Sequence, residues 1–160
     1  MRDMNDNNFR LNAVQQLNIS REEAWEFFSS PRNLARITPP SMDFRIISEL
    51  NGDKIVEGMC IEYSVRPILG IPVRWKSKIT RIKPGVSFTD LQLKGPYKYW
   101  EHKHTFSEEN GGITMRDEIR YKLFGGWFGK ILHRLYIRGK LNELFEYRER
   151  QINKIFANGS

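Results

Sequence analysis

The stretch Trp127–Phe156, WFGKILHRLYIRGKLNELFEYRERQINKIF, decides the fold of this chain. Its apolar residues recur mostly at steps of three or four, which is the spacing of one face of an α-helix. Gly125-Gly126 stands immediately before it, at the point where the hydrophobic period changes. The stretch predicts one long amphipathic helix, in which Gly139 weakens the middle by about 1 kcal/mol relative to alanine and is the expected position of a bend.

The chain before this helix reads mainly as strands. A first strand is expected at Phe9–Asn18, and Ser20-Arg21-Glu22-Glu23 forms a capping box that opens a short helix. A second short helix is expected at Arg32–Ile37, and Asn51-Gly52-Asp53 reads as a turn. Further strands are predicted at Met42–Leu50, Met59–Arg66, Pro72–Lys83, Val86–Leu93, Tyr97–Ser107 and Ile113–Phe124.

This order of elements predicts the fold class. An antiparallel sheet of this size has one apolar face to cover, and a long helix with an apolar stripe can cover it. We therefore predict an α+β fold in which a curved antiparallel sheet wraps around the long C-terminal helix. Such an arrangement leaves an internal cavity between the sheet and the helix.

Length and composition are those of one folded domain. The chain has 160 residues, of which 39% are hydrophobic, so we expect a folded chain. We expect a polar, flexible N-terminus over residues 1–8 and a single domain over residues 9–157. A single cysteine excludes an intrachain disulfide. No apolar run reaches the roughly 20 residues that span a bilayer, so we expect a cytoplasmic protein.

The charge balance indicates no nucleic-acid partner. The net charge is +7, from 26 Lys and Arg against 19 Asp and Glu. These basic residues are spread along the chain without a block of five or six like charges. A positively charged patch for nucleic acid is therefore not predicted.

The stretch Trp100-Glu101-His102-Lys103-His104-Thr105-Phe106 carries the candidate site. Successive side chains of a strand point to opposite faces. Trp100, His102, His104 and Phe106 therefore share one face, which places two imidazoles between two large apolar side chains. Two titratable rings are unusual on a half-buried surface, so this strand is the first place to look for function.

Acidic and amide side chains on neighbouring strands are expected to meet the two histidines. Asp90, Gln92 and Asp117 fall on the same concave side, where a buried carboxylate is costly unless it is paired. Three interpretations remain open. The residues form a polar network that fixes strand register, a polar end of the cavity that binds a ligand head group, or a His/Asp acid–base pair.

A metal site at the histidines is a weaker hypothesis. His102 and His104 have the spacing of a chelating pair, with Asp117 or Asp90 as a third ligand. A clear third and fourth ligand are missing from the sequence pattern. We therefore predict no metal and no cofactor.

Several motifs together resemble those of a known superfamily. They are Pro31-Arg32-Asn33-Leu34, Thr38-Pro39-Pro40, Asp90-x-Gln92-x-x-Gly95-Pro96-Tyr97, Trp100-x-His102-x-His104-x-Phe106 and Asp117-x-Ile119-x-Tyr121. With the order of elements, they resemble the helix-grip superfamily called SRPBCC, which includes START-like lipid-binding domains and birch-pollen-allergen-like proteins. The chain looks most like a bacterial, ligand-binding group of that superfamily with similarity to polyketide cyclases and dehydrases.

The resemblance implies a hydrophobic cavity roofed by the C-terminal helix, and it implies binding of a small hydrophobic molecule. A carrier or sensor of a lipid, fatty acid or aromatic acid is favoured. The alternative is a cyclase or dehydratase that uses His102 or His104 as a base. The residues expected to contact the ligand are Tyr63, Trp75, Phe88, Asp90, Gln92, Trp100, His102, His104, Phe106, Met115, Asp117, Tyr121, Phe128, Leu132 and Leu135.

The polar part of this site predicts the kind of head group. Imidazolium and Gln92 can donate hydrogen bonds, which favours an acidic or hydroxylated ligand. Binding of an anionic head group should weaken as pH rises through the histidine pKa values.

The start of the long helix allows a second kind of partner. Trp127-Phe128 lies beside Lys130, His133, Arg134, Arg138 and Lys140, and basic amphipathic helices can rest on anionic membranes. The sequence favours the other interpretation, in which the apolar stripe packs on the sheet. Oligomeric state is left open.

Overall fold

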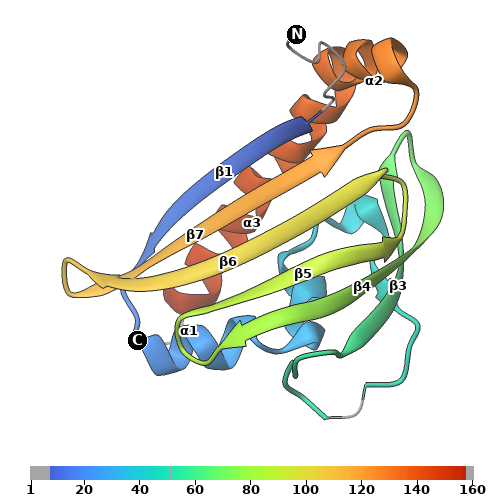
Figure 1. The fold of residues 1–160 in the computed structure, drawn as a ribbon. Helices are drawn as coiled ribbons and strands as arrows, with labels where there is room; N and C mark the ends of the chain where they lie inside the picture. The colour runs from blue at the N-terminus through green and yellow to red at the C-terminus, as the bar shows by residue number, and fades with distance from the viewer. Residues whose placement is uncertain (1–7, 51, 158–160) are drawn as a thin grey trace, which may run out of the picture.

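One curved sheet and one long bent helix make up the fold (Figure 1). The computed structural model describes residues 8–50 and 52–157. In this part of the chain, seven strands form an antiparallel sheet in the order β1-β7-β6-β5-β4-β3-β2. They are β1 (Asn8–Leu17), β2 (Arg45–Ile46), β3 (Cys60–Ile68), β4 (Ile71–Lys83), β5 (Ser87–Lys94), β6 (Tyr99–Glu109) and β7 (Gly112–Lys122).

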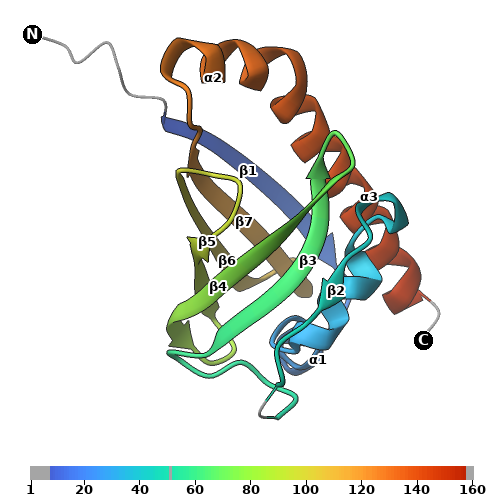
Figure 2. The same cartoon turned by 90° about the vertical axis from the view of Figure 1, so that its right-hand side faces the viewer.

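The helices cover the concave side of this sheet (Figure 2). They are α1 (Arg21–Phe28), the 3₁₀ turns η1 (Pro31–Ile37) and η2 (Pro40–Met42), then α2 (Gly126–Leu132), the π-helical turn η3 (His133–Ile137) and α3 (Arg138–Ala157). None of the described helices is long and apolar enough to cross a bilayer. The predicted α+β arrangement of a curved sheet around a C-terminal helix is confirmed.

Alternation along the central strands builds the concave face. On β7, Ile113, Met115, Asp117, Ile119 and Tyr121 are all buried. Because strand side chains alternate between faces, these five point to one side of the sheet. The register of β6 and β7 pairs Trp100 with Tyr121 and His104 with Asp117, so the faces of the two strands coincide.

The predicted capping box at the first helix is present. Ser20 Oγ accepts from the Glu23 amide at 3.2 Å, and Glu23 Oε2 accepts from the Ser20 amide at 2.8 Å. Two otherwise unsatisfied amides at the helix start are thereby bonded. The helix buries Ala24 and Phe27 against the sheet end.

The long helix is bent, and the bend lies in the π-helical turn. Residues 126–132 are α-helical, residues 133–137 form the π turn, and residues 138–157 are α-helical again. Figure 2 shows α2 turned away from the axis of α3. The predicted bounds of the long helix are confirmed. The bend begins six residues before Gly139, because an inserted π turn changes the helix direction.

The segment before β3 differs most from the prediction. Only Arg45–Ile46 of the predicted strand Met42–Leu50 is paired, since Pro40–Met42 forms a 3₁₀ turn and Asp43 has a left-handed φ of 43°. Asn8 belongs to β1 and not to a flexible tail. Residues 1–7 of the predicted flexible N-terminus and Asn51 of the predicted turn lie outside the described residues.

Candidate functional site

A cavity of about 670 Å³ lies between the sheet, the helix α3 and the turns η1 and η2. Aromatic and aliphatic side chains from both layers line most of it. On the side of α1 these include Phe27, Phe28 and Ile37, and near the bend of the long helix they include Trp75, Trp100 and Leu141. A volume of this size accommodates a small organic ligand.

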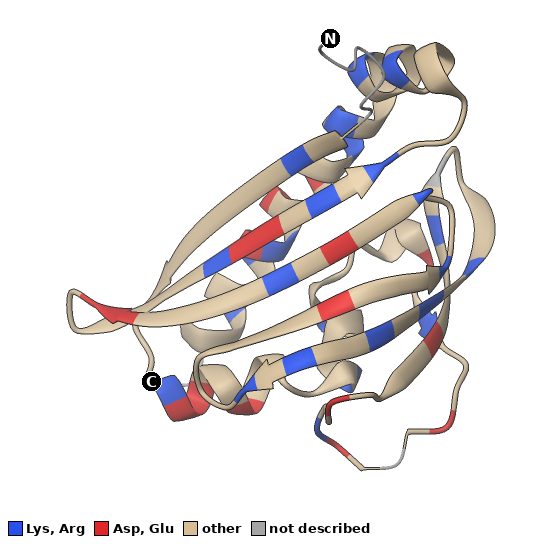
Figure 3. Ribbon diagram, viewed as in Figure 1, with Lys and Arg blue, Asp and Glu red and all other residues tan. Residues whose placement is uncertain are grey.

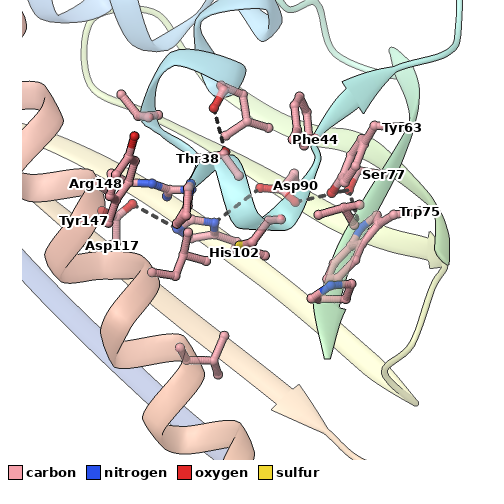
Figure 4. A pocket seen from close by; sticks show the side chains of 18 of the residues that line it. Thr38, Phe44, Tyr63, Trp75, Ser77, Asp90, His102, Asp117, Tyr147 and Arg148 are labelled. Atoms are coloured by element: carbon pink, nitrogen blue, oxygen red, sulfur yellow. Dashed lines mark hydrogen bonds and ion pairs between the residues drawn. The ribbon is translucent and has the colours of Figure 1, made fainter. Parts of the chain in front are cut away.

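A polar belt crosses the cavity wall between two apolar clusters (Figure 4). It consists of Ser77 on β4, Asp90 on β5, His102 and His104 on β6 and Asp117 on β7. One apolar cluster holds Ile79, Phe88, Phe106 and Met115, and the other holds Trp75, Trp100 and Ile119. The polar groups thus form a belt in the middle of the wall and not a polar end of the cavity.

The carboxylate of Asp117 holds both imidazole rings. Its Oδ1 lies 2.9 Å from His102 Nε2 and 2.6 Å from His104 Nδ1. The first contact is a hydrogen bond, whereas the second is a close contact that lacks hydrogen-bond geometry. The two rings lie side by side with centroids 3.9 Å apart, so one buried carboxylate sets the orientation of both.

Ionisation of this group follows from burial and mutual contact. Burial raises the pKa of Asp117, but the electrostatic and hydrogen-bond contacts with His104 and His102 outweigh it, so the pKa lies well below its ordinary value. Burial, with the neighbouring His102 ring, lowers the pKa of His104. An ionised Asp117 beside a neutral His104 requires that ring to carry its proton on Nδ1.

The other nitrogens of the two rings face Asp90. Asp90 Oδ2 lies 3.8 Å from His102 Nδ1 and 3.8 Å from His104 Nε2, which is too long for a direct hydrogen bond. Asp90 Oδ1 accepts from Ser77 Oγ at 3.4 Å, and Ser77 Oγ accepts from the Trp75 indole at 3.1 Å. Two ring nitrogens and a carboxylate oxygen therefore converge on one part of the cavity wall formed by β5 and β6.

Arg148 approaches the belt from helix α3. The residue is 8% exposed and lines the cavity. No carboxylate of the described residues lies within 4.0 Å of its guanidinium, and its Nε has no hydrogen-bond partner. Burial lowers its pKa, and Asp117 and Asp90 oppose that effect. A guanidinium stays protonated in proteins, so the cavity contains a buried cation without a close anion.

The convergent donors could hold a small divalent cation. The ligand atoms of Asp90, His102 and His104 lie within 4.8 Å of one another, and Asp117 would orient both rings from behind. The guanidinium of Arg148, which interacts electrostatically with Asp90 and Asp117, opposes a second cation there. The arrangement suits a ligand group that both donates and accepts hydrogen bonds.

Nine of the fifteen predicted site residues line the cavity. They are Tyr63, Trp75, Phe88, Asp90, Trp100, His102, His104, Met115 and Asp117. Three others are used elsewhere in the fold. The Gln92 amide donates to the Tyr97 carbonyl at 2.7 Å and supports the β5–β6 turn, Phe106 packs against Phe28 in the core, and Tyr121 O–H contacts His133 Nε2 at 2.8 Å.

The placement of Phe128, Leu132 and Leu135 in the cavity wall is wrong. These side chains are 65%, 42% and 77% exposed. The bend at η3 turns this part of the long helix, so its apolar side faces away from the sheet. The cavity is roofed instead by Ile137, the last residue of the bend, and by residues after it such as Leu141 and Leu144.

The sequence reasoning missed Arg148 and the turns that close the cavity. Leu141, Arg148 and Ile152 are the buried residues of α3, at spacings of seven and four. An arginine at a position of the helix's apolar stripe is the sequence signal that could have identified Arg148. Thr38 and Phe44 also line the cavity, and they belong to a segment whose sequence predicted only a helix end and a strand.

Comparisons with known proteins find the same fold among solved structures. No protein-family model matches the chain, and no curated protein is a significant relative in sequence. Among solved structures, ginseng major latex-like protein 151 from Panax ginseng matches with a TM-score of 0.69 and 14% identity, over 94% of this chain and 99% of that chain. Protein Ms6760 from Mycobacterium smegmatis matches with a TM-score of 0.68 and 17% identity, over 94% and 92% of the two chains.

A third structure, TTHA0849 from Thermus thermophilus, has a TM-score of 0.68 and 15% identity, over 95% of this chain and 99% of that chain. Three structures from a plant and two bacteria therefore share this fold over nearly the whole chain. The predicted fold class is confirmed: this chain has the helix-grip fold.

Proposed function

We propose that the protein binds a small hydrophobic ligand carrying a hydroxyl or carboxyl group, as a carrier or sensor. The observation that carries this proposal is Arg148, a buried cation in a largely apolar cavity with no close anion in the described part of the chain. A buried charge is retained at a cost unless a partner compensates it. A polar group of a ligand is such a partner.

Complementary groups face each other across the cavity. Arg148 offers donors from α3, whereas Asp90 Oδ2, His102 Nδ1 and His104 Nε2 converge from the sheet. A ligand hydroxyl can accept a hydrogen bond from Arg148 and donate one to the group of acceptors on the sheet. A carboxyl group can do the same when it is protonated. The apolar clusters on both sides of the belt would then hold the aromatic or aliphatic body.

This arrangement changes the expected pH dependence of anion binding. The charge that faces an anionic head group at neutral pH is the guanidinium of Arg148, since burial lowers the pKa of His104. Binding of a carboxylate should therefore persist well above the ordinary histidine pKa. The affinity for a carboxylate should not fall across neutral pH, as it would if a protonated histidine bound the anion.

Isothermal titration calorimetry with naphthalene, naphthol and naphthoic acid tests the proposal, because the three share one apolar body. We expect naphthol and naphthoic acid to bind at least roughly tenfold more tightly than naphthalene, because each can form a charge-assisted hydrogen bond with Arg148. Arg148→Met should remove this preference. Arg81→Gln, an exposed arginine on β4, is the matched control and should leave it intact.

A second variant should affect the two polar ligands differently. Asp90→Asn removes a negative charge beside the head group, so naphthoic acid should bind more tightly and naphthol no more tightly than before. Circular dichroism confirms that each variant is folded. Equal affinity for all three compounds, or an unchanged preference in a folded Arg148→Met variant, would contradict the proposal, and consumption of a bound compound would favour an enzyme.

A further inference from the structure

We propose that the end of the molecule formed by α2 docks on an anionic lipid bilayer. The surface consists of six apolar side chains that are between 42% and 77% exposed, here called the exposed apolar face: Phe124, Trp127, Phe128, Ile131, Leu132 and Leu135. Five of them follow the helix at steps of one, three, one and three residues and therefore share one side of it. This proposal does not depend on which ligand occupies the cavity.

The apolar side of α2 faces outward because another side of the helix meets the protein. Gly129 is buried, and a Cβ there would lie 2.5 Å from the Phe124 carbonyl oxygen. One turn later, the His133 ring stacks on Phe9 with centroids 3.6 Å apart and contacts the Tyr121 hydroxyl. Glycine and histidine thus form the packed side, and the apolar side chains of α2 are left for another environment.

The charged side chains of the stretch that carries this face are all basic. From Ile119 to Asn142 the chain has six Lys or Arg side chains and no Asp or Glu. Figure 3 shows the basic residues over α2 and the adjoining ends of β1 and β7, with the acidic residues further along the helix and strands. Exposed aromatic side chains flanked by basic ones suit an interface of acyl chains and anionic headgroups.

Part of the cavity lining lies toward this end of the molecule. Leu69, at the tip of the β3–β4 hairpin, lines the cavity and is also 66% exposed, so the cavity reaches the surface there. The Leu69 amide donates to the Tyr136 hydroxyl at 3.0 Å, which holds the hairpin tip against η3. Figure 2 shows this tip beside the bent part of the helix that follows α2. A bilayer on the exposed apolar face, which includes Leu135 of η3, would therefore lie near one place where the cavity reaches the surface.

A second copy of the chain fits this face less well than a bilayer. Symmetric packing of two such faces places the same patch of each copy against the other. The flanking cations Arg134 and Arg138 of both copies would then be brought together, and like charges at close range repel. An anionic surface instead neutralises them.

Vesicle flotation tests the proposal. We expect the protein to float with phosphatidylcholine vesicles in which one lipid in three is phosphatidylglycerol, and to float much less with pure phosphatidylcholine. Trp127→Ser/Phe128→Ser/Leu135→Ser should abolish flotation, and Arg134→Gln/Arg138→Gln should weaken it roughly tenfold. All five side chains are exposed, so these variants should fold.

Matched controls lie outside the face. Val14→Ser/Leu93→Ser removes apolar side chains that are 60% and 51% exposed, and Lys78→Gln/Lys103→Gln removes exposed cations on the sheet. Both controls should float like the unmodified protein. Equal flotation of the apolar-face variant and its control would overturn the proposal. The proposal would also be overturned if sedimentation showed that the protein self-associates without lipid and that only the apolar-face variant does not.

Discussion

At the scale of single residues, Asp117 is the centre of the polar belt. It is 2% exposed and contacts both imidazoles from the strand that pairs with theirs. The alternation of strand side chains predicted that Asp117 and the two histidines share a face, and they do. The 3.8 Å separations from Asp90 depend on side-chain rotamers, which a sequence pattern does not determine.

The absence of Gln92 from the belt also has a local cause. Glycine follows three residues later, and a Cβ at Gly95 would lie 2.3 Å from Gln92 Oε1. The Gln92 amide folds back over that glycine and bonds both backbone groups of Tyr97. Alternation predicts the face on which a side chain begins, but local hydrogen-bond partners decide where its end goes.

The lowered pKa values predict that the protein is destabilised by acid. The ordinary pKa of His104 is 6.5, and burial lowers it in the fold, so the unfolded chain binds the proton more strongly. The free energy of unfolding should be greatest above pH 6.5 and fall as pH drops below it, by up to about 1.4 kcal/mol per pH unit. Asp117, with its lowered pKa, should add a further loss below its ordinary value of 3.8.

Urea unfolding at pH 7 and pH 5 measures this effect, with His104→Gln beside the unmodified protein. The variant should lose much of the pH dependence. Burial also lowers the pKa of the less buried His133, so His133→Gln serves as the comparison and should retain more of the dependence than His104→Gln. An unchanged slope in His104→Gln would show that its protonation is not linked to folding.

At the scale of elements, the strands were predictable and the shape of the long helix was not. Two-residue alternation and turn residues located the strands from β3 to β7 within about two residues, because each has one buried face. Helical periodicity also predicted the extent of the C-terminal helix. It could not predict the π turn at His133–Ile137, which lies between the close packing of Gly129 on the Phe124 carbonyl and the stacking of His133 on Phe9, far away in the sequence.

Two glycines of this helix have opposite roles, which predicts opposite effects of alanine. Gly139→Ala places a Cβ in open space within an exposed part of α3, so it should stabilise the protein by about 1 kcal/mol. Gly129→Ala forces a Cβ against the Phe124 carbonyl and should destabilise the contact between α2 and the end of β7. Urea unfolding of both variants is the measurement. Equal stabilisation by the two substitutions would contradict the close packing at Gly129.

At the scale of the whole molecule, the fold separates a ligand cavity from an outward-facing helix. The sheet, α3 and the 3₁₀ turns enclose the cavity, while the bend at η3 directs α2 away from it. Helix periodicity alone could not distinguish an apolar stripe that covers a core from one that faces outward. The distinction needs the packed side of α2, where a glycine and a histidine stand in place of aliphatic residues.

In the proposed complex, the cavity holds an apolar ligand whose polar group lies between Arg148 and the polar belt. Anomalous diffraction from crystals grown with a brominated naphthol tests it most directly, because bromine locates the ligand independently of refinement. We predict a bromine peak inside the cavity, with the hydroxyl within hydrogen-bond distance of Arg148 or Asp90. Bromine found only on the exposed apolar face, under conditions in which calorimetry shows saturation, would contradict the claim.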